Sequence, residues 1–503
     1  MSHNLEYEGN GIYTDGILNY EIFDAEDEKI VKICGMSARE NHIVIPKNVQ
    51  IEGDIYTVGE INPGTFFRKK SLETVVIPDS ISEIQENTFE RCISLKSIDL
   101  PNSINNIKKS AFSDCKSLRT IVIPDSVISI EEYSFNNCNS MESITIPESV
   151  TIIGNNAFSG CKSLKSIILP DSIKSIGESA FSDCISLESV TIPKFVTAIE
   201  NNTFSGCKSL KTITIPDSVE RIGSNAFCYC SSLQDVYIPN SVVELGIQAF
   251  GMCKSLQSIR IPASMKWITG NSLIDCPSLK SIDVDENNPH YLAEDNILFS
   301  KSKDTIIRFP QGSDLLEYTI PDSVKVIESS AFESCKKLKS IHIPDSVTYV
   351  GMDAFKKCAS LKQIVIPDSV EKIGIAAFSS CRALESVTIS KSIRSIDKFT
   401  FSGCKKLESI EIPDSVEIID VWAFYGCTSL KNIKIPDSVI WIGEGAFQEC
   451  TSLEKIIIPD SVRRIDDFAF AKCTSLKSVN IPDSVKKIGK DIFKLCDNLD
   501  KNI

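Results

Sequence analysis

The cysteines are the residues of this sequence whose type and spacing suggest chemistry. Nineteen occur in the 503-residue chain, and most of them recur at steps of 23 residues. The first run is Cys92, Cys115, Cys138, Cys161, Cys184, Cys207, Cys230, Cys253 and Cys276, and the second is Cys335, Cys358, Cys381, Cys404, Cys427, Cys450, Cys473 and Cys496. Such a column is either a metal or redox site or a structural position.

The surroundings of the cysteines favour the structural interpretation. Zinc sites need C-x-x-C pairs with a second pair or with histidines, whereas the nearest pattern here is Cys228-Tyr229-Cys230, and the chain has only 4 histidines. Disulfides between adjacent copies are compatible with the spacing alone. We expect small buried thiols packed behind a phenylalanine, without metal or cofactor, so that Cys184→Ser would bury a hydroxyl without a partner.

The cysteines belong to a repeat that reads I-P-D-S-V-x-x-I-G-x-x-A-F-x-x-C-x-S-L-x-x-I-x. A fixed period of roughly 20–50 residues indicates a solenoid. "LKTITIP" (210–216) predicts a short strand with alternating faces, and "PDSV" predicts a turn. "VERIG" then crosses the far side, and "NAFCYC" closes the coil as a helical turn. We predict a mainly β repeat solenoid of about 18 coils of 23 residues, with a parallel β-sheet on one face.

The pattern L-x-x-I-x-I-P with A-F-x-x-C, from about residue 57 to the end, resembles the BspA-like leucine-rich repeats of the Treponema pallidum class. The resemblance implies a right-handed leucine-rich-repeat superhelix. It also implies adhesion or protein binding, with a host extracellular-matrix or cell-surface protein as the partner. It implies no catalytic residues.

Two segments depart from the period and divide the chain. Residues 1–56 are predicted to form an N-terminal β-hairpin cap from "LNYEIF" and "KIVKI", because a solenoid end needs a capping element. The arrays are residues 57–283 with ten coils and residues 321–503 with eight coils. Between them, residues 284–320 are predicted to be an irregular insert with a β-hairpin around "SKSKD".

The acidic stretch "DVDENNPHYLAE" beside the insert raises the alternative of a calcium loop. Asp283, Asp285, Asn287 and Glu294 fall at ligand positions of an EF-hand, but Asn288 stands where that loop needs glycine. A solvated acidic turn is therefore the favoured interpretation. The aspartates that follow the prolines are likewise interpreted as turn residues.

Charge and hydropathy limit the partners. Lys and Arg number 53 against 67 Asp and Glu, a net charge of −14, which argues against nucleic acid and anionic membranes. No apolar stretch approaches a membrane span, so we expect no membrane insertion. The segment "MSHNLEYEGNGIYTDG" shows no secretory signal and favours the cytoplasm, whereas the family resemblance favours the cell surface.

The outward residues of the predicted strands are candidates for recognition. The first outward position is mostly Ser or Thr, whereas the second varies from coil to coil. Variation in a repeated unit shows that the fold does not dictate the residue, although tolerance alone is an equal alternative. From their side-chain chemistry the candidate partner-binding residues are Tyr237, Arg260, Asp283, His342, Glu411 and Lys434.

The opposite face offers a second candidate surface. Trp267, Tyr349 and Trp441 occupy equivalent positions two residues before the glycine turn, and Trp422 is nearby. Exposed aromatic side chains there would mark another interface, and partial packing between coils is the alternative.

Three function classes follow from these patterns. A protein-binding or adhesion scaffold is favoured by the repeat, the variable column and the resemblance. A structural rod that associates end to end is the second. An enzyme is disfavoured, because histidine is scarce and neither G-x-S-x-G nor a P-loop occurs.

Overall fold

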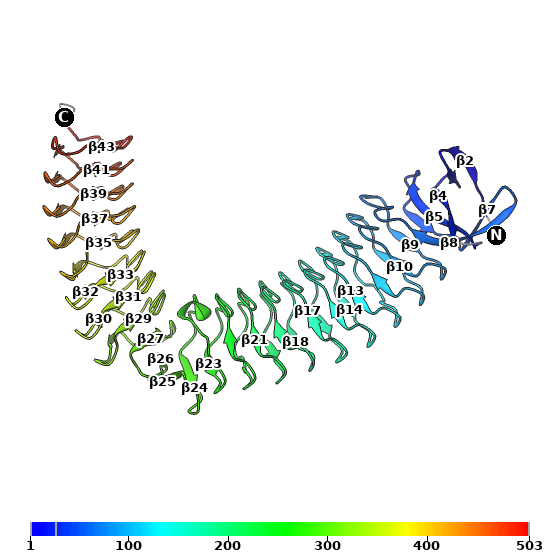
Figure 1. Cartoon of the computed structure of the whole chain (residues 1–503), viewed down its shortest axis with the longest axis horizontal. Helices are drawn as coiled ribbons and strands as arrows, with labels where there is room; N and C mark the ends of the chain where they lie inside the picture. The colour runs from blue at the N-terminus through cyan, green and yellow to red at the C-terminus, as the bar shows by residue number, and fades with distance from the viewer. Residues whose placement is uncertain (1–2, 26–27, 501–503) are drawn as a thin grey trace. The chain divides into compact units, whose positions relative to one another are not determined.

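The computed structural model describes residues 3–25 and 28–500. The chain divides into two compact units, unit 1 (Met1–Leu256 with Ser264–Ile268) and unit 2 (Gln257–Ala263 with Thr269–Ile503). Within each unit the coils lie side by side (Figure 1), and strands 23 residues apart pair in parallel, for example Ser189 with Thr212. The predicted solenoid of 23-residue coils is confirmed in both units.

The N-terminal part of unit 1 is a seven-stranded sheet rather than a lone hairpin. Its order is β1-β7-β8-β5-β4-β3-β2, and its strands are β1 (His3–Asn4), β2 (Glu6–Gly9), β3 (Ile12–Thr14), β4 (Leu18–Ala25), β5 (Glu28–Met36), β7 (Asn48–Ile51) and β8 (Asp54–Ile61). The segments "LNYEIF" and "KIVKI" lie in β4 and β5, which pair antiparallel. β5 also pairs in parallel with β8, and this long-range pairing has no local signal in the sequence.

The strand face of each unit consists of the short strands that end before the proline turns. In unit 1 they are β6 (His42–Val44), β9 (Thr74–Val76), β11 (Ser97–Asp99), β14 (Ser143–Thr145), β16 (Ser166–Ile168), β18 (Ser189–Thr191) and β20 (Thr212–Thr214). In unit 2 they are β23 (Ser258–Ile261), β24 (Ser281–Val284), β28 (Glu317–Thr319), β30 (Ser340–His342), β32 (Gln363–Val365), β34 (Ser386–Thr388), β36 (Ser409–Glu411), β38 (Asn432–Lys434), β40 (Lys455–Ile457) and β42 (Ser478–Asn480). β6 pairs in parallel with β9, so the strand face begins inside the segment predicted as the cap.

A second set of parallel strands, which the sequence analysis did not anticipate, runs along the far side. In unit 1 it comprises β10 (Glu83–Ile84), β12 (Asn106–Ile107), β13 (Ser129–Ile130), β15 (Ile152–Ile153), β17 (Ser175–Ile176), β19 (Ala198–Ile199), β21 (Arg221–Ile222) and β22 (Glu244–Leu245). In unit 2 it comprises β29 (Val326–Ile327), β31 (Tyr349–Val350), β33 (Lys372–Ile373), β35 (Ser395–Ile396), β37 (Ile418–Ile419), β39 (Trp441–Ile442), β41 (Arg464–Ile465) and β43 (Lys487–Ile488). Two residues per strand are too few to show a period in the sequence.

The predicted insert lies inside unit 2 and carries β25 (Tyr291–Glu294), β26 (Ile297–Ser300) and β27 (Thr305–Arg308). β26 pairs antiparallel with both β25 and β27. β27 also pairs in parallel with β29, which joins the insert to the second set of strands. The insert is therefore continuous with the following coils.

The segment around each A-F dipeptide is a series of tight turns and not the predicted helical turn. Among residues 3–25 and 28–500 the only helical segment is the 3-10 turn η1 (Gly270–Leu273). In "NAFCYC", Asn225 and Tyr229 have φ of 56° and 63°, and the left-handed region interrupts a right-handed helix. The N–H of Phe227 instead donates to the carbonyl of Ala249 in the next coil at 2.8 Å.

The core of each unit is a stack of phenylalanines, one from each coil. In unit 1 the ring centroids are 5.1–5.6 Å apart along Phe66, Phe89, Phe112, Phe135, Phe158, Phe181, Phe204, Phe227 and Phe250. In unit 2 they are 5.0–5.7 Å apart along Phe309, Phe332, Phe355, Phe378, Phe401, Phe424, Phe447, Phe470 and Phe493. Phe309 lies 23 residues before Phe332 and belongs to the column, although the sequence analysis assigned it to the insert.

Candidate functional site

The cysteine column is a ladder of hydrogen bonds between coils. Most thiols of the column donate to the carbonyl of the phenylalanine 26 residues earlier, as Cys184 does to Phe158 at 3.2 Å and Cys404 does to Phe378 at 3.3 Å, whereas Cys276 donates to the carbonyl of Ile274 at 3.6 Å. Thiols are weak donors, but a buried carbonyl benefits from any partner. Contrary to our expectation, a serine at position 184 would therefore find an acceptor already in place.

Burial makes these thiols unreactive. It raises the pKa of Cys92 and Cys427 to about 12, and it raises the pKa of Cys184 well above the usual value. The thiolate is the nucleophile and the metal ligand, so a neutral buried thiol serves neither role. Among the described residues, no group of three or more His, Cys, Asp and Glu side chains is arranged to hold a metal ion.

Thiol labelling of the folded chain is expected to modify two cysteines. Cys34 and Cys496 are half-buried, whereas the other cysteines are buried. A hydrogen bond with the Cys473 thiol lowers the pKa of Cys496, so Cys496 should react first. Mass mapping after a maleimide pulse measures this, with Cys496→Ser as the control that removes the fast phase. Rapid labelling of many column cysteines in the native state would contradict the structural role.

The serines of most PDSV turns form a second ladder. Their hydroxyls donate to the carbonyl 22 residues earlier, as Ser172 does to Val150 at 2.8 Å and Ser438 does to Val416 at 2.6 Å, whereas the hydroxyls of Ser415 and Ser484 have no partner among the described residues. Some of the preceding aspartates form exposed ion pairs, such as Asp171 with Lys194 at 2.8 Å. The PDSV motif is thus accounted for by turn formation and inter-coil bonding.

The six predicted partner-binding residues lie in the outward column of the strand face, formed by the second outward residue of each coil. All six predicted residues of this column are exposed. Arg260 and Asp283 face each other across β23 and β24, with 3.7 Å between Arg260 Nε and Asp283 Oδ2. Glu411 and Lys434 are register partners on β36 and β38. His342 is the register partner of Thr319, and Tyr237 lies in unit 1.

Arg260 is also held by the acidic turn that follows β24. Its Nη2 lies 3.3 Å from Asp285 Oδ2, and Asp285 Oδ1 accepts the N–H of Asn287 at 3.0 Å. The bond from Asn287 and the neighbouring guanidinium lower the pKa of Asp285. This carboxylate is therefore occupied by protein donors, which matches a turn residue better than a calcium ligand.

The outward column of unit 1 also contains exposed apolar residues that are not among the predicted partner-binding residues. Val44, Val122 and Ile168 are 72%, 80% and 77% exposed, and Tyr237 is 67% exposed. Thr145, Thr191 and Thr214 continue the column, and Asp99 is its charged member. The sequence does show these β-branched residues at outward positions, but Tyr and Arg are more frequent in interface hot spots and were therefore favoured as candidates.

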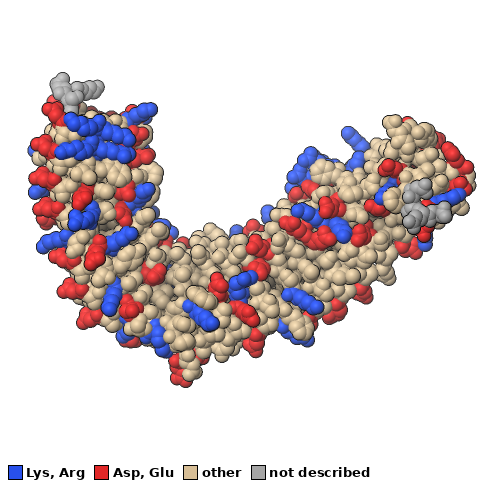
Figure 2. Space-filling view, in the orientation of Figure 1, with Lys and Arg blue, Asp and Glu red and all other residues tan. Residues whose placement is uncertain are grey.

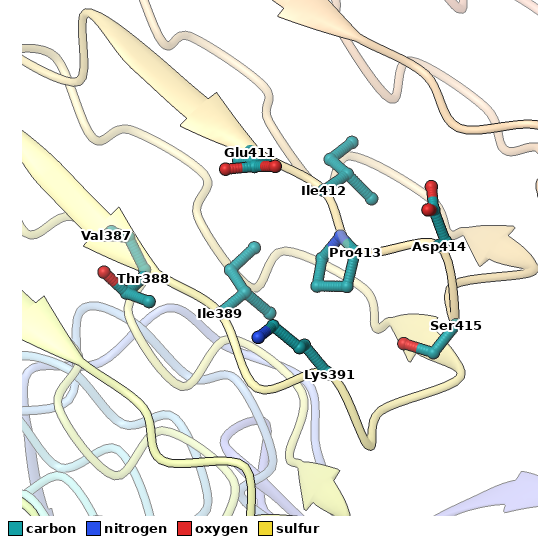
Figure 3. A pocket seen from close by; sticks show the side chains of 9 residues that line it. All are labelled: Val387, Thr388, Ile389, Lys391, Glu411, Ile412, Pro413, Asp414 and Ser415. Atoms are coloured by element: carbon teal, nitrogen blue, oxygen red, sulfur yellow. The ribbon is translucent and has the colours of Figure 1, made fainter.

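A cavity of about 430 Å³ opens on unit 2 between the ends of β34 and β36 (Figure 3). Buried apolar side chains line it, namely Val387 of β34, Ile389 directly after β34 and Ile412 directly after β36. The polar lining comes from Thr388, Lys391, Glu411, Asp414 and Ser415. The predicted residue Glu411 is therefore part of a formed pocket.

The model of the BspA type leucine rich repeat region matches residues 59–188, 174–306, 308–427 and 394–503. The chain belongs to the BspA-type leucine-rich repeat family. No curated protein matches the sequence.

Solved structures of several bacterial leucine-rich repeat proteins resemble the BspA-type chain. A protein from Eubacterium ventriosum has 24% identity and a TM-score of 0.50, covering 71% of this chain and 83% of its own, and this likeness concerns the fold alone. A leucine rich cell surface protein from Faecalibacterium prausnitzii has 31% identity and a TM-score of 0.43, covering 89% and 95%. The Treponema pallidum leucine-rich repeat protein has 28% identity and a TM-score of 0.32, covering 44% and 96%.

The aromatic residues of the second candidate surface are dispersed over the BspA-type coils. Trp267 is 60% exposed in unit 1, whereas Trp441 is half-buried in unit 2. The Trp441 ring lies 5.1 Å from the Arg464 guanidinium, and its Nε1 donates to Asp466 at 2.9 Å. Trp422 contacts Phe399, with ring centroids 4.9 Å apart, and Tyr349 lies on β31. Trp441 and Trp422 thus have partners within their own unit.

Charged residues of both signs are distributed over the BspA-type repeats (Figure 2). Lys and Arg gather on the last coils of unit 2, where several are neutralised by ion pairs such as Lys472–Glu449 at 2.7 Å and Arg464–Asp466 at 2.6 Å. Within the described ranges, none of the helical structure is long and apolar enough to cross a membrane.

Proposed function

We propose that this BspA-type chain is a non-enzymatic scaffold that binds a protein partner through its strand face. The observation that carries the proposal is the outward column of unit 1. Its regular neighbour is Ser or Thr, whereas Val122 and Ile168 expose 80% and 77% of their surface without a packing role. Exposed apolar side chains on a rigid sheet are typical of interaction surfaces.

The fold supports this role by fixing the side chains in a row. Parallel strands place equivalent residues about 4.8 Å apart, so a partner meets a pre-organised surface and little conformational entropy is lost on binding. From the family resemblance we propose a host extracellular-matrix or cell-surface protein as the partner and a microbial surface as the location. Protease shaving of intact cells tests the location.

A binding assay with matched variants tests the function. The full chain is titrated against immobilised collagen, fibronectin and laminin as representative matrix proteins. Val122→Lys with Ile168→Lys is expected to weaken binding at least tenfold, because the lysines interrupt the apolar contact. The control is Ile152→Lys, an exposed β-branched residue of the second set of strands in the same unit, which should change binding less than twofold.

Two outcomes would contradict the strand-face assignment. In the first, the Ile152 variant loses as much affinity as the double variant. In the second, only Trp267→Ser or Trp441→Ser abolishes binding, which would move the interface to the opposite face. Circular dichroism should be unchanged in the lysine variants, because Val122, Ile168 and Ile152 are exposed.

A further inference from the structure

We propose that unit 1 carries a second recognition surface, a row of lysines that binds a linear acidic polysaccharide with one acidic group in each disaccharide. This inference goes beyond the proposed protein-binding function and concerns another part of the coil. The lysine row comprises Lys70, Lys116, Lys162, Lys208 and Lys254. The period of these lysines, their lack of neutralising partners and a cationic hollow at one end of the row point to this ligand.

The lysines of the row recur every 46 residues, which places them in alternate coils. Each directly follows the cysteine column, with Lys69 in the cysteine position before Lys70, and all five are exposed. The intervening coils carry uncharged residues at the same position, Ile93, Asn139, Ile185 and Ser231. In unit 2 this position reads Lys336, Ala359, Arg382, Lys405, Thr428, Thr451 and Thr474. The repeat itself therefore does not require the alternation seen in unit 1.

The alternation sets the distance between the positive charges. The nearby rings of Phe112, Phe135 and Phe158 are 5.3 and 5.4 Å apart from coil to coil, so equivalent residues of alternate coils are separated by about 10 Å. A nucleic acid strand carries a phosphate about every 3.4 Å, a charge density about three times higher. Two sugar rings of an extended polysaccharide cover a length similar to the lysine spacing. The row therefore matches a polymer with one acidic group per disaccharide.

The protein leaves most of the lysine row without a counter-charge. Lys116 lies 4.0 Å from Asp114, and the other four lysines form no ion pair with any described residue. The column three residues further along behaves differently, because Lys96 pairs with Glu73 at 2.7 Å and Lys211 pairs with Glu188 at 2.9 Å. The ammonium groups of the lysine row can therefore pair with an external anion.

A continuous column of hydroxyls accompanies the lysines. A serine follows the row position in every coil, and its side chain is half-buried or exposed. These serines are Ser71, Ser94, Ser117, Ser140, Ser163, Ser186, Ser209, Ser232 and Ser255. Within the part of the chain that the structure describes, none of their hydroxyls has a hydrogen-bond partner. A serine hydroxyl both donates and accepts, which suits the hydroxyls of sugar rings that lie between two acidic groups.

A cationic hollow of about 460 Å³ lies at the N-terminal end of the row. It spans three coils and is lined by Arg68, Lys70, Arg91, Ile93, Asp114 and Lys116. Arg91 lies 3.5 Å from Glu90 and 3.8 Å from Asp114, whereas Arg68 forms no ion pair among residues 3–25 and 28–500. The Arg68 guanidinium can therefore hold a carboxylate through two parallel hydrogen bonds. The hollow supplies an anchor for one acidic group at the end of the polysaccharide.

Fluorescence polarisation of a labelled hyaluronan decasaccharide, titrated with the full chain, tests the lysine row. Hyaluronan carries one carboxylate per disaccharide, and the row extends over about 40 Å, so the decasaccharide spans it. Lys162→Gln with Lys208→Gln should lower the affinity at least tenfold. The matched control, Lys165→Gln with Lys211→Gln, removes two exposed lysines from the same two coils, in the column that also holds Glu188. This control should change the affinity less than twofold.

The hollow is tested by Arg68→Gln with Lys70→Gln, which should also lower the hyaluronan affinity at least tenfold. Heparin decasaccharide and oligo(dT) carry denser charge and should bind no more tightly than hyaluronan at about 0.15 M salt. Tighter binding of either probe, unchanged affinity in the hollow variant, an equal loss in the control variant, or no hyaluronan binding at millimolar concentration would overturn the proposal. None of these results bears on the matrix-protein assay with the Val122 and Ile168 variants, so the two proposals fail separately.

Discussion

Replacing Phe181 by alanine is expected to lower the free energy of unfolding of unit 1 by about 3–5 kcal/mol. The ring is fully buried and lies between Phe158 and Phe204, with centroid distances of 5.4 and 5.5 Å. Its backbone N–H is held by the carbonyl of Thr203 at 2.9 Å, and each coil touches only its neighbours. The chain therefore cannot collapse around the missing ring, so the free-energy cost of the empty cavity adds to the lost burial of the ring.

Hydrogen exchange of the full chain, followed by mass spectrometry, measures this loss coil by coil. The matched control is Phe195→Ala in the same unit, where the phenylalanine is 57% exposed and truncation should cost less than about 1 kcal/mol. Protection of the coils around residue 181 should fall, while coils in unit 2 keep theirs. A loss no larger than that of the control would show that the phenylalanine stack does not carry the stability.

Replacing Arg308 by methionine is expected to raise the free energy of unfolding of unit 2 by about 1–4 kcal/mol. Arg308 is fully buried at the end of β27. Its Nη1 donates to the carbonyl of Ser330, but Nε and Nη2 have no partner among the described residues. The Ser330 carbonyl also accepts the N–H of Glu333 at 3.1 Å. Removing the guanidinium therefore leaves this carbonyl oxygen with a hydrogen-bond donor. A methionine of similar length fills the space without the desolvation cost.

Urea unfolding with a probe in unit 2 measures this gain. Arg394→Met is the control, because Arg394 is exposed and forms a surface pair with Glu417 at 2.9 Å; such pairs contribute about 0–1 kcal/mol. A clear loss of stability in Arg308→Met would contradict the expectation, since it would mean that the buried charge is compensated.

Much of the fold could be predicted from the sequence, because the repeat tests each assignment many times. The inward positions Leu210, Ile213 and Phe227 are buried as expected. The second set of strands could not be predicted, since two-residue strands leave no period. The left-handed residues at Asn225 and Tyr229 were also missed. Glycine precedes the cysteine in some coils, as at Gly160 and Gly206, but in most coils another residue type holds the same conformation.

The candidate site was harder to predict from the sequence than the fold, because it depends on positions where single coils deviate from the repeat pattern. The Ser390 substitution was visible, but the displaced hydrogen bonds of Ser390 to Val370 and of Ser392 to Asp368 required coordinates. Likewise, the outward column identified Glu411 without indicating that it borders a cavity. The exposure of Val122 and Ile168 follows from strand alternation, yet its extent depends on the size of the neighbouring side chains.

The thiol ladder has a consequence for where such a protein can work. Column cysteines such as Cys161 and Cys427 are free and buried, and their sulfurs are already engaged with carbonyls of the preceding coil at 3.2 Å. Exchange with a disulfide requires an accessible thiolate. Burial makes these thiols inaccessible, and their raised pKa keeps them protonated. The cohesion of the coils is therefore independent of the redox potential of the surroundings. The same array holds together in a reducing compartment and in an oxidising one, with no cross-link to form or lose.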